Sequence, residues 1–385
     1  MSAPVRDPDP GAQPFHETRP LDEMRPLHEA VEEAEDAVRA LLRAAGAEGD
    51  AALTPLRGGA NNRVYRVDCG GRRFLLKRYY RPVCGGRDRL ASDFAFCAFA
   101  RRAGLDAAPA PLARDAERGM ALYEYIEGRP LEPREIGDEA VGAALDFFLA
   151  LNRCRSLPEA QGLPLGAEAF FSLEGHAGCV RGRLDALCRM DSGTPLQAEA
   201  KDFVRNALEP AGRRVIEALR GEAVKRPYGG TRDLAQGPEG GDRCLSPSDF
   251  GFHNALRERG GRLRFFDFEY AGWDDPAKAV CDFFCQPALP VPQRSREAFS
   301  LGVASLFRDR EFHLRRFRLL LPLFQVKWCC IMLNPFLREG SRRRAFALED
   351  NALKDGDGGD DGKLEEHRLL QLGKAKELYG RIGCV

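Results

Sequence analysis

The chain has 385 residues, of which 44% are hydrophobic and 30% are charged, a balance typical of globular proteins that are large enough for two lobes. Its 58 Lys and Arg residues equal its 58 Asp and Glu residues, so no overall charge favours nucleic acid or an anionic membrane as a partner. The 12 cysteines include no Cys-x-x-Cys pair and no histidine at zinc-ligand spacing, which argues against a zinc site and favours the reducing cytoplasm.

The first part of the chain predicts a disordered tail followed by a helix. Residues 1–24 are rich in proline and charge, poor in large apolar residues, and contain no apolar signal region. A helix that stops near Gly46 is then indicated by apolar residues on one helical face, namely Leu27, Val31, Val38, Leu41 and Leu42.

The next hundred residues predict a small lobe built around a sheet. Strands are expected at residues 64–67 and 73–78 on either side of the turn Cys69-Gly70-Gly71, because the residues there alternate with a period of two. A helix over 88–103 and a strand over 121–126 follow. The segment Glu127-Gly128-Arg129-Pro130 is expected to end the sheet.

The rest of the chain predicts a larger helical lobe with one β insertion at residues 262–268. Helical patterns cover residues 142–152, 198–219 and 312–333. The longest apolar stretch, 319–333, is interrupted by polar residues and proline, and we expect no membrane span. Residues 354–363 predict a flexible acidic loop, since their oxygen-bearing side chains lack the register of a calcium loop. The fold class is therefore α+β with two lobes, an N-lobe at 25–127 and a C-lobe at 128–385.

Two short segments of the second lobe carry the chemistry. Asp249 has Asn254 five positions later, and Asp267 lies 18 residues beyond Asp249. Upstream, the apolar strand Phe74-Leu75-Leu76-Lys77 ends in a lysine. Phosphoryl transfer from a nucleotide needs such a set: a carboxylate at the acceptor hydroxyl, oxygen ligands for Mg²⁺, and a cation on the phosphates. Each residue alone has an ordinary explanation as a turn, cap or solvated charge; the ordered set predicts a small-molecule kinase.

These residues, together with Asp267-Phe268-Glu269-Tyr270-Ala271-Gly272-Trp273, resemble the aminoglycoside phosphotransferase and choline kinase-like family, which has the protein-kinase-like fold. The resemblance covers roughly residues 50 to 340. It implies that Asp249 is the catalytic base for the acceptor hydroxyl and that Asn254 and Asp267 hold Mg²⁺. It also implies that Lys77 binds the nucleotide phosphates and pairs with a carboxylate on the following helix, by position Asp93.

The same resemblance assigns the rest of the nucleotide site. Gly58, Gly59 and Asn61 occupy the position of the phosphate-covering loop, where glycines let backbone N–H groups approach phosphate oxygens. Glu124 and Ile126 occupy the position of the hinge that holds the nucleotide base through backbone groups. Because backbone contacts do not depend on side-chain identity, ATP and GTP stay equal alternatives as the co-substrate.

Two departures from the family pattern motivate an alternative function. Pro247 stands where the family usually has a histidine, and Asp93 stands where it usually has the longer glutamate. The alternative is a catalytically weak pseudokinase that binds nucleotide and acts as an interaction module. For the kinase, the expected acceptor is a sugar, amino sugar or amino alcohol. Its identity, any role in antibiotic resistance and the oligomeric state are left open by the sequence.

Overall fold

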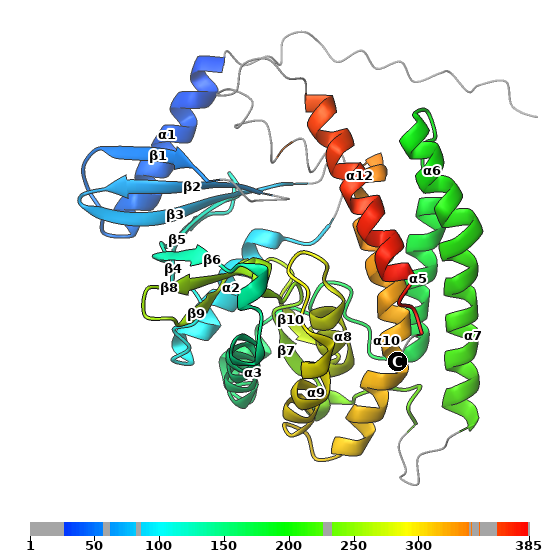
Figure 1. The fold of residues 1–385 in the computed structure, drawn as a ribbon. Helices are drawn as coiled ribbons and strands as arrows, with labels where there is room; N and C mark the ends of the chain where they lie inside the picture. Colours follow the sequence, from blue (N-terminus) through cyan, green and yellow to red (C-terminus); the bar gives the residue numbers. More distant parts are fainter. Residues whose placement is uncertain are drawn as a thin grey trace, which may run out of the picture.

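The structure, a computed structural model, describes residues 27–56, 62–81, 86–225, 233–338, 340, 346 and 360–383. The predicted tail at 1–24, the phosphate-covering residues Gly58, Gly59 and Asn61, and the loop residues 354–359 lie outside these ranges. A sheet-containing N-terminal part sits above a larger helical part, as the two-lobed α+β prediction requires (Figure 1).

The N-lobe contains a five-stranded antiparallel sheet of order β1-β2-β3-β5-β4. Its strands are β1 (Ala51–Pro55), β2 (Asn62–Cys69), β3 (Arg72–Tyr79), β4 (Pro111–Asp115) and β5 (Met120–Glu124). Gly70 and Gly71 join β2 to β3 with φ of 57° and 72°, a left-handed conformation that glycine adopts without strain. The edge strands β1 and β4 were not predicted, because each is short and has a weak period-two pattern.

Two helices pack on this lobe, and strand alternation decides which residues each one contacts. The α1 helix (Leu27–Ala44) contributes Leu41 and Leu42 to a cluster with Phe74 and Leu76. Side chains along a strand alternate between faces, so Lys77 and Tyr79 lie on the other face. That face packs against α2 (Arg89–Arg102) and the C-lobe.

The C-lobe helices surround one long central helix, α10 (Arg310–Met332), which contacts α5, α7, α8, α9 and α12 (Figure 1). The lobe's other helices are α3 (Asp138–Arg153), α4 (Pro158–Gln161), α5 (Leu173–Cys188), α6 (Pro195–Phe203), α7 (Glu209–Lys225), α8 (Pro276–Cys285), α9 (Arg296–Ala304) and α12 (Asp360–Tyr379). Residues 198–219, predicted as one helix, divide into the end of α6, a π-helical turn at Val204–Leu208 and most of α7.

Two small sheets carry the loops of the candidate site. β7 (Cys244–Ser246) pairs with β10 (Gly272–Asp274), and β8 (Ala255–Glu258) lies between β6 (Gly128–Pro130) and β9 (Leu263–Phe265). The large sheet ends before Gly128 and Pro130, as predicted. They leave the large sheet but form β6, since proline is tolerated on an edge strand.

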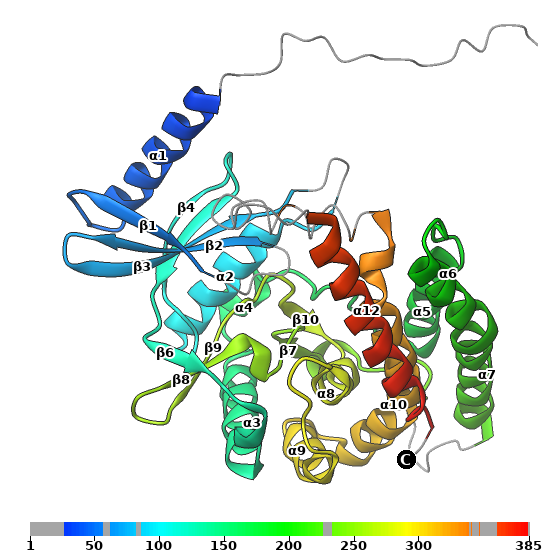
Figure 2. The same cartoon turned by 45° about the horizontal axis from the view of Figure 1, so that its top comes forward.

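Two further predictions change at the end of the chain. Asp360 begins α12, so residues 360–363 are helical and do not belong to a flexible loop. The apolar stretch at 319–333 is part of the longer helical segment Arg310–Phe336, which has the length and composition to cross a membrane. Within the fold, however, 72% of its most apolar window is buried, as in the core helix of a globular lobe. Figure 2 shows α12 running alongside this helix.

Candidate active site

The loop that contains Asp249, the predicted catalytic base, runs from the end of β7 to the start of β8; we refer to it as the catalytic loop. Ser248 has a φ of 64°, which redirects the chain immediately before Asp249. Asn254 closes the loop, because its side-chain Nδ2 donates to the carbonyl oxygen of Asp249 at 2.9 Å. The loop therefore presents Asp249 from a fixed turn between two strands.

Asp249 is held as a carboxylate by a neighbouring histidine. His253 Nε2 lies 3.3 Å from Asp249 Oδ1, and the Asp249 side chain keeps 34% of its surface exposed. Burial alone would raise the pKa of Asp249, but the hydrogen bond and the charge of His253 lower it below its ordinary value. The Asp249 carboxylate is consequently ionised at neutral pH and can accept a proton or a hydrogen bond from an acceptor hydroxyl.

Ser248, next to Asp249, anchors the loop to the C-lobe core. Its Oγ donates to Asp274 Oδ2 at 3.3 Å and accepts from Lys278 Nζ at 3.3 Å. Asp274 and Lys278 form a buried ion pair at 2.7 Å. These contacts fix the loop in a chain that has Pro247 where the family usually has histidine.

Asn254 and Asp267, the predicted metal ligands, lie on neighbouring strand ends. The backbone N–H of Phe266 donates to the carbonyl oxygen of Asn254 at 3.0 Å, which places Asp267 one residue beyond this contact. Asp267 has a φ of 68°, an uncommon conformation for a non-glycine residue, and its side chain is 30% exposed. The two segments thus bring Asn254 and Asp267 onto adjacent stretches of backbone.

This pair suits Mg²⁺, which takes hard oxygen ligands, often one or two from the protein and the rest from phosphates and water. Among the described residues, no group of three or more His, Cys, Asp and Glu side chains is placed to hold a metal ion. A site of the Asn254–Asp267 kind therefore needs the phosphates of a nucleotide to complete its coordination.

Lys77 lies between two carboxylates. Its Nζ is 2.8 Å from Asp93 Oδ2 and 2.9 Å from Asp267 Oδ1, with only 6% of its side chain exposed. Burial alone would lower the pKa of Lys77, but the charges of Asp267 and Asp93 raise it above its ordinary value. Asp93, although shorter than glutamate, spans the distance to Lys77 and also accepts a hydrogen bond from the hydroxyl of Tyr79 at 2.7 Å.

Glu269 is a site residue that sequence analysis left without a role. Its Oε2 accepts a hydrogen bond from Asn62 Nδ2 at 2.6 Å, and its side chain is buried. Burial, followed by the charge of Asp267, raises the pKa of Glu269 to about 7. Its spacing of two residues from Asp267 gave no usable signal, because the left-handed conformation of Asp267 (φ 68°) and the turn at Glu269 interrupt the alternation of an extended strand.

The hinge residues sit at the end of β5, where the chain passes from the large sheet to β6. The backbone N–H of Glu124 donates to the carbonyl oxygen of Ala110 at 2.8 Å, and its carboxylate accepts from Arg264 Nη2 at 3.0 Å. In the described part of the chain, no backbone hydrogen bond uses the N–H of Ile126. Ile126 therefore keeps a main-chain donor of the kind that a nucleotide base requires.

A cavity of about 510 Å³ opens beside Asp249 and extends into the C-lobe; we refer to it as the acceptor cavity. Catalytic-loop residues line one side, and α8, α10 and α12 line the other. Its lining includes Asp249, His253, Tyr270, Lys278, Asp282, Lys327, Trp328, His367 and Gln371. The α12 residues of this lining, His367 and Gln371, follow the loop expected at 354–363, in a segment where no helix was predicted.

A chain of ion pairs, partly buried, lines the acceptor cavity. Lys278 lies 3.1 Å from Asp282, Lys327 lies 3.8 Å from Asp282 and 3.3 Å from Glu168, and Arg183 lies 2.5 Å from Glu168. Burial alone would raise the pKa of Glu168, but Lys327 and Arg183 lower it to about 2. These residues are spread along the sequence from position 168 to position 327, and no local sequence pattern groups them.

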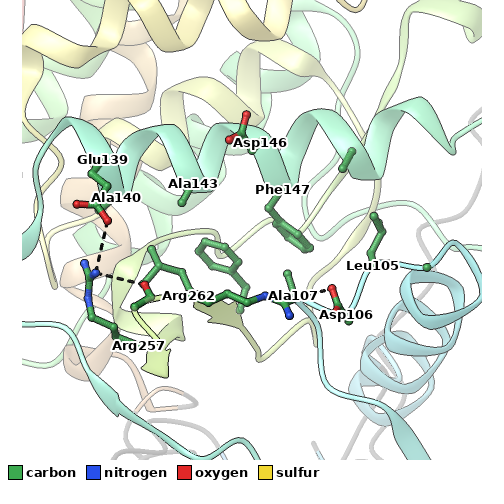
Figure 3. Close-up of a pocket in the computed structure, with 15 residues that line it drawn as sticks. Leu105, Asp106, Ala107, Glu139, Ala140, Ala143, Asp146, Phe147, Arg257 and Arg262 are labelled. Atoms are coloured by element: carbon green, nitrogen blue, oxygen red, sulfur yellow. Dashed lines mark hydrogen bonds and ion pairs between the residues drawn. The ribbon is translucent and has the colours of Figure 1, made fainter. Parts of the chain in front are cut away.

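A second hollow, of about 440 Å³, lies away from these residues between α3 and the β8–β9 hairpin (Figure 3). Figure 3 shows Arg257 reaching toward Glu139, and Arg262 paired with Asp106. None of the predicted site residues lines this hollow. This hollow is therefore separate from the residues that the sequence predicted to form the site.

The profile of the Phosphotransferase enzyme family matches residues 52–318, more than half of the chain. The chain belongs to this family. The resemblance drawn from Lys77, Asp249, Asn254 and Asp267 is confirmed, and with it the prediction of a small-molecule phosphotransferase that has an alcohol group as acceptor. Comparison with curated protein sequences gave no match.

Solved structures share the fold at low sequence identity. Spectinomycin phosphotransferase APH(9)-Ia in complex with ADP and spectinomycin aligns with a TM-score of 0.55 and 13% identity, over 89% of this chain and 98% of its own. The ethanolamine kinase of Plasmodium vivax aligns with a TM-score of 0.51 and 13% identity, over 85% and 81% respectively. The gentamicin complex of APH(2")-IIa aligns with a TM-score of 0.50 and 14% identity, over 90% and 97%. These alignments confirm the protein-kinase-like fold.

Proposed function

We propose that this phosphotransferase moves the γ-phosphate of ATP or GTP, in a Mg²⁺-dependent reaction, to a hydroxyl of a small molecule such as a sugar, amino sugar or amino alcohol. The observation that supports it most is the contact of Lys77 with Asp267. The residue before Asp267 is hydrogen-bonded through its backbone to Asn254, and the side chain of Asn254 donates to the carbonyl oxygen of Asp249. One connected set of contacts, which includes the backbone hydrogen bond from Phe266 to Asn254, thus joins the predicted phosphate cation, the predicted metal ligands and the predicted base. The ADP bound in the structure of spectinomycin phosphotransferase APH(9)-Ia, which shares the fold, agrees with a nucleotide co-substrate.

Each residue has a distinct task in this proposal. Asp249 accepts a hydrogen bond from the acceptor hydroxyl, aligns its oxygen and takes its proton as phosphoryl transfer proceeds. Lys77, kept charged and oriented by Asp93, donates to nucleotide phosphate oxygens. Asp267 and the amide oxygen of Asn254 would hold Mg²⁺, which would neutralise phosphate charge.

The remaining proposed contacts hold the nucleotide. Gly58, Gly59 and Asn61 cover its phosphates through backbone N–H groups. The backbone of Glu124 and Ile126 holds the base. We place the reaction in the reducing cytoplasm, in agreement with the free thiol of every cysteine that the structure describes.

The test is transfer of labelled γ-phosphate from ATP, and separately from GTP, into a fractionated metabolite extract with Mg²⁺. The wild type is compared with Asp249→Ala and with Asp146→Ala, which removes an exposed carboxylate on α3. We expect labelled product from the wild type and Asp146→Ala, and a loss of turnover by orders of magnitude in Asp249→Ala with nucleotide binding retained. Equal turnover in all three proteins would remove Asp249 from the mechanism. Nucleotide binding without transfer by any of them would favour the pseudokinase.

A further inference from the structure

The charges that line the acceptor cavity indicate which class of acceptor it takes. The described lining holds four arginine and lysine side chains, Arg89, Arg183, Lys278 and Lys327, besides His253, and three carboxylates, Glu168, Asp249 and Asp282. The balance is therefore slightly positive. A cavity suited to a polycationic acceptor would present an excess of carboxylates instead.

The two carboxylates of this lining other than Asp249 are already neutralised from within the protein. Glu168 contacts Arg183 with Oε1 and Lys327 with Oε2. Asp282 contacts Lys278 and Lys327 with Oδ2, and its Oδ1 accepts a hydrogen bond from Trp328 Nε1 at 2.7 Å. Since both oxygens of each group are engaged, a cationic acceptor would have to compete with buried internal cations for them.

Arg89 differs from the other cations of the lining. It is the first residue of α2, and 90% of its side chain is buried, the exposed fraction being 10%. Its Nη1 is buried without a hydrogen-bond partner in the structure. The nearest carboxylate oxygen, Oε1 of Glu269, lies at 4.0 Å, beyond hydrogen-bond distance. The guanidinium carbon lies over the Tyr270 ring, 5.3 Å from its centroid, a cation–π contact.

An unpartnered guanidinium donor that is nine-tenths buried and lines a cavity is suited to an anion. Guanidinium groups bind carboxylates and phosphates through two parallel hydrogen bonds, and the strength of these bonds increases away from water. Asp249 lines the same cavity, so a single bound molecule can contact both residues.

We propose, on the basis of the kinase function above, that Arg89 selects an acceptor that carries both a hydroxyl and an anionic group, a carboxylate or a phosphate. The anionic group binds Arg89 and the hydroxyl faces Asp249. The acceptor is then a hydroxy acid, a zwitterionic amino alcohol with a carboxylate, or a sugar acid or sugar phosphate. Purely cationic amino sugars and amino alcohols are disfavoured.

The test measures the binding of four sets of compounds to the full chain loaded with ADP and Mg²⁺. Thermal shift identifies the compounds that stabilise the protein, and titration calorimetry then gives the affinity of each. The sets are hydroxy-carboxylates (glycerate, gluconate, homoserine), phosphomonoesters (glycerol phosphate, glucose phosphate), neutral polyols (glycerol, glucose) and cations (choline, ethanolamine, spectinomycin). The variants are Arg89→Gln, Arg89→Lys and Arg101→Gln, the last of which removes an exposed arginine from the same helix.

We expect a compound of the first or second set to bind the wild type and Arg101→Gln equally. Binding should weaken by about tenfold to a hundredfold in Arg89→Gln and by less in Arg89→Lys, because lysine keeps the charge but loses the paired geometry. Which of the two sets binds distinguishes a carboxylate from a phosphate. The proposal is overturned if only neutral or cationic compounds bind, if no compound binds, if Arg89→Gln binds as the wild type does, or if that variant loses ADP affinity instead.

Transfer of phosphate from ATP to the compound that binds then tests the kinase separately. Binding that depends on Arg89, without transfer, would contradict the proposed function and leave the anion site in place. Transfer to a cationic or neutral compound, undiminished in Arg89→Gln, would leave the kinase in place and remove the role of Arg89.

Discussion

Asp93 accepts a hydrogen bond from the backbone N–H of Phe268 at 3.1 Å, although the two residues are 175 positions apart. The same carboxylate contacts Lys77 through its other oxygen. Asp93 thereby connects α2 to the segment that follows Asp267. The position of Lys77 therefore depends on the position of this segment.

This double contact predicts that Asp93→Ala weakens nucleotide binding and the fold together. Removing one partner of a buried ion pair costs about 3 kcal/mol of unfolding free energy. We expect a loss of this order, together with a nucleotide KM raised by about tenfold. Chemical denaturation and initial rates at varied nucleotide measure the two effects. Asp93→Asn, which can still accept from Phe268, should lose less stability; an Asp93→Ala protein as stable as the wild type would contradict the connection.

Asp267→Asn is expected to raise the Mg²⁺ concentration that the reaction requires. The substitution keeps an oxygen ligand but removes the charge that attracts the ion, and it weakens the contact with Lys77. We expect turnover to fall by a factor on the order of 100. The measurement is kcat as a function of Mg²⁺, with Asp146→Asn on the surface of α3 as the control for lost charge. An unchanged half-saturating Mg²⁺ concentration would count against Asp267 as a ligand.

Ser248→Ala should slow the reaction without changing nucleotide binding. The hydroxyl connects the catalytic loop to Asp274 and Lys278, so its loss frees the turn that presents Asp249. Misplacing a catalytic group by a fraction of an ångström predicts a fall in kcat of about tenfold, with the nucleotide KM unchanged. Ser305→Ala, at an exposed helix end, is the control. A larger effect on KM than on kcat would indicate that Ser248 serves the nucleotide instead.

The contacts of Asp275 predict how the free energy of unfolding depends on pH in the acid range. It caps α8 by accepting from the N–H of Ala277 at 2.8 Å, and it contacts Arg316 and His176. Burial alone would raise its pKa, but Arg316 and then His176 lower the pKa to about 2, below the ordinary 3.8. Because the folded pKa is depressed, this stabilisation is present above about pH 4 and is lost as the pH falls toward 2. Its size is about 2 kcal/mol.

The check is unfolding free energy measured across this acid range for the wild type, Asp275→Asn and Asp146→Asn. The wild type and Asp146→Asn should lose stability with the same steep slope as the pH falls. Asp275→Asn should be less stable at neutral pH, where it leaves Arg316 buried without its charge partner, and should show a shallower acid slope. Parallel slopes in all three proteins would rule out Asp275 as the source.

The sequence predicted those features of the fold and the site for which a particular residue type at a particular spacing is required. Strand periodicity predicted the β2–β3 hairpin, and the apolar strand ending in Lys77 marked a lysine that would need anionic partners. Asp249, Asn254 and Asp267 could be recognised because phosphoryl transfer restricts the side chains that may occupy these positions and because β8 and β9 are joined by a short turn. The family profile and the similar structures confirm the family and the fold, whereas the roles of Lys77, Asp249, Asn254 and Asp267 stay predictions.

The acceptor cavity was decided only by the tertiary structure. Glu168, Asp282 and Lys327 each look like solvated charges in the sequence, and their pairing exists because α8 and α10 pack against each other. Arg89 gave no signal either, since a single arginine at a helix start is ordinary until its burial and its unpartnered Nη1 are known. Local patterns report the chemistry that a chain can carry, whereas the charges that face a bound acceptor depend on contacts between residues far apart in sequence.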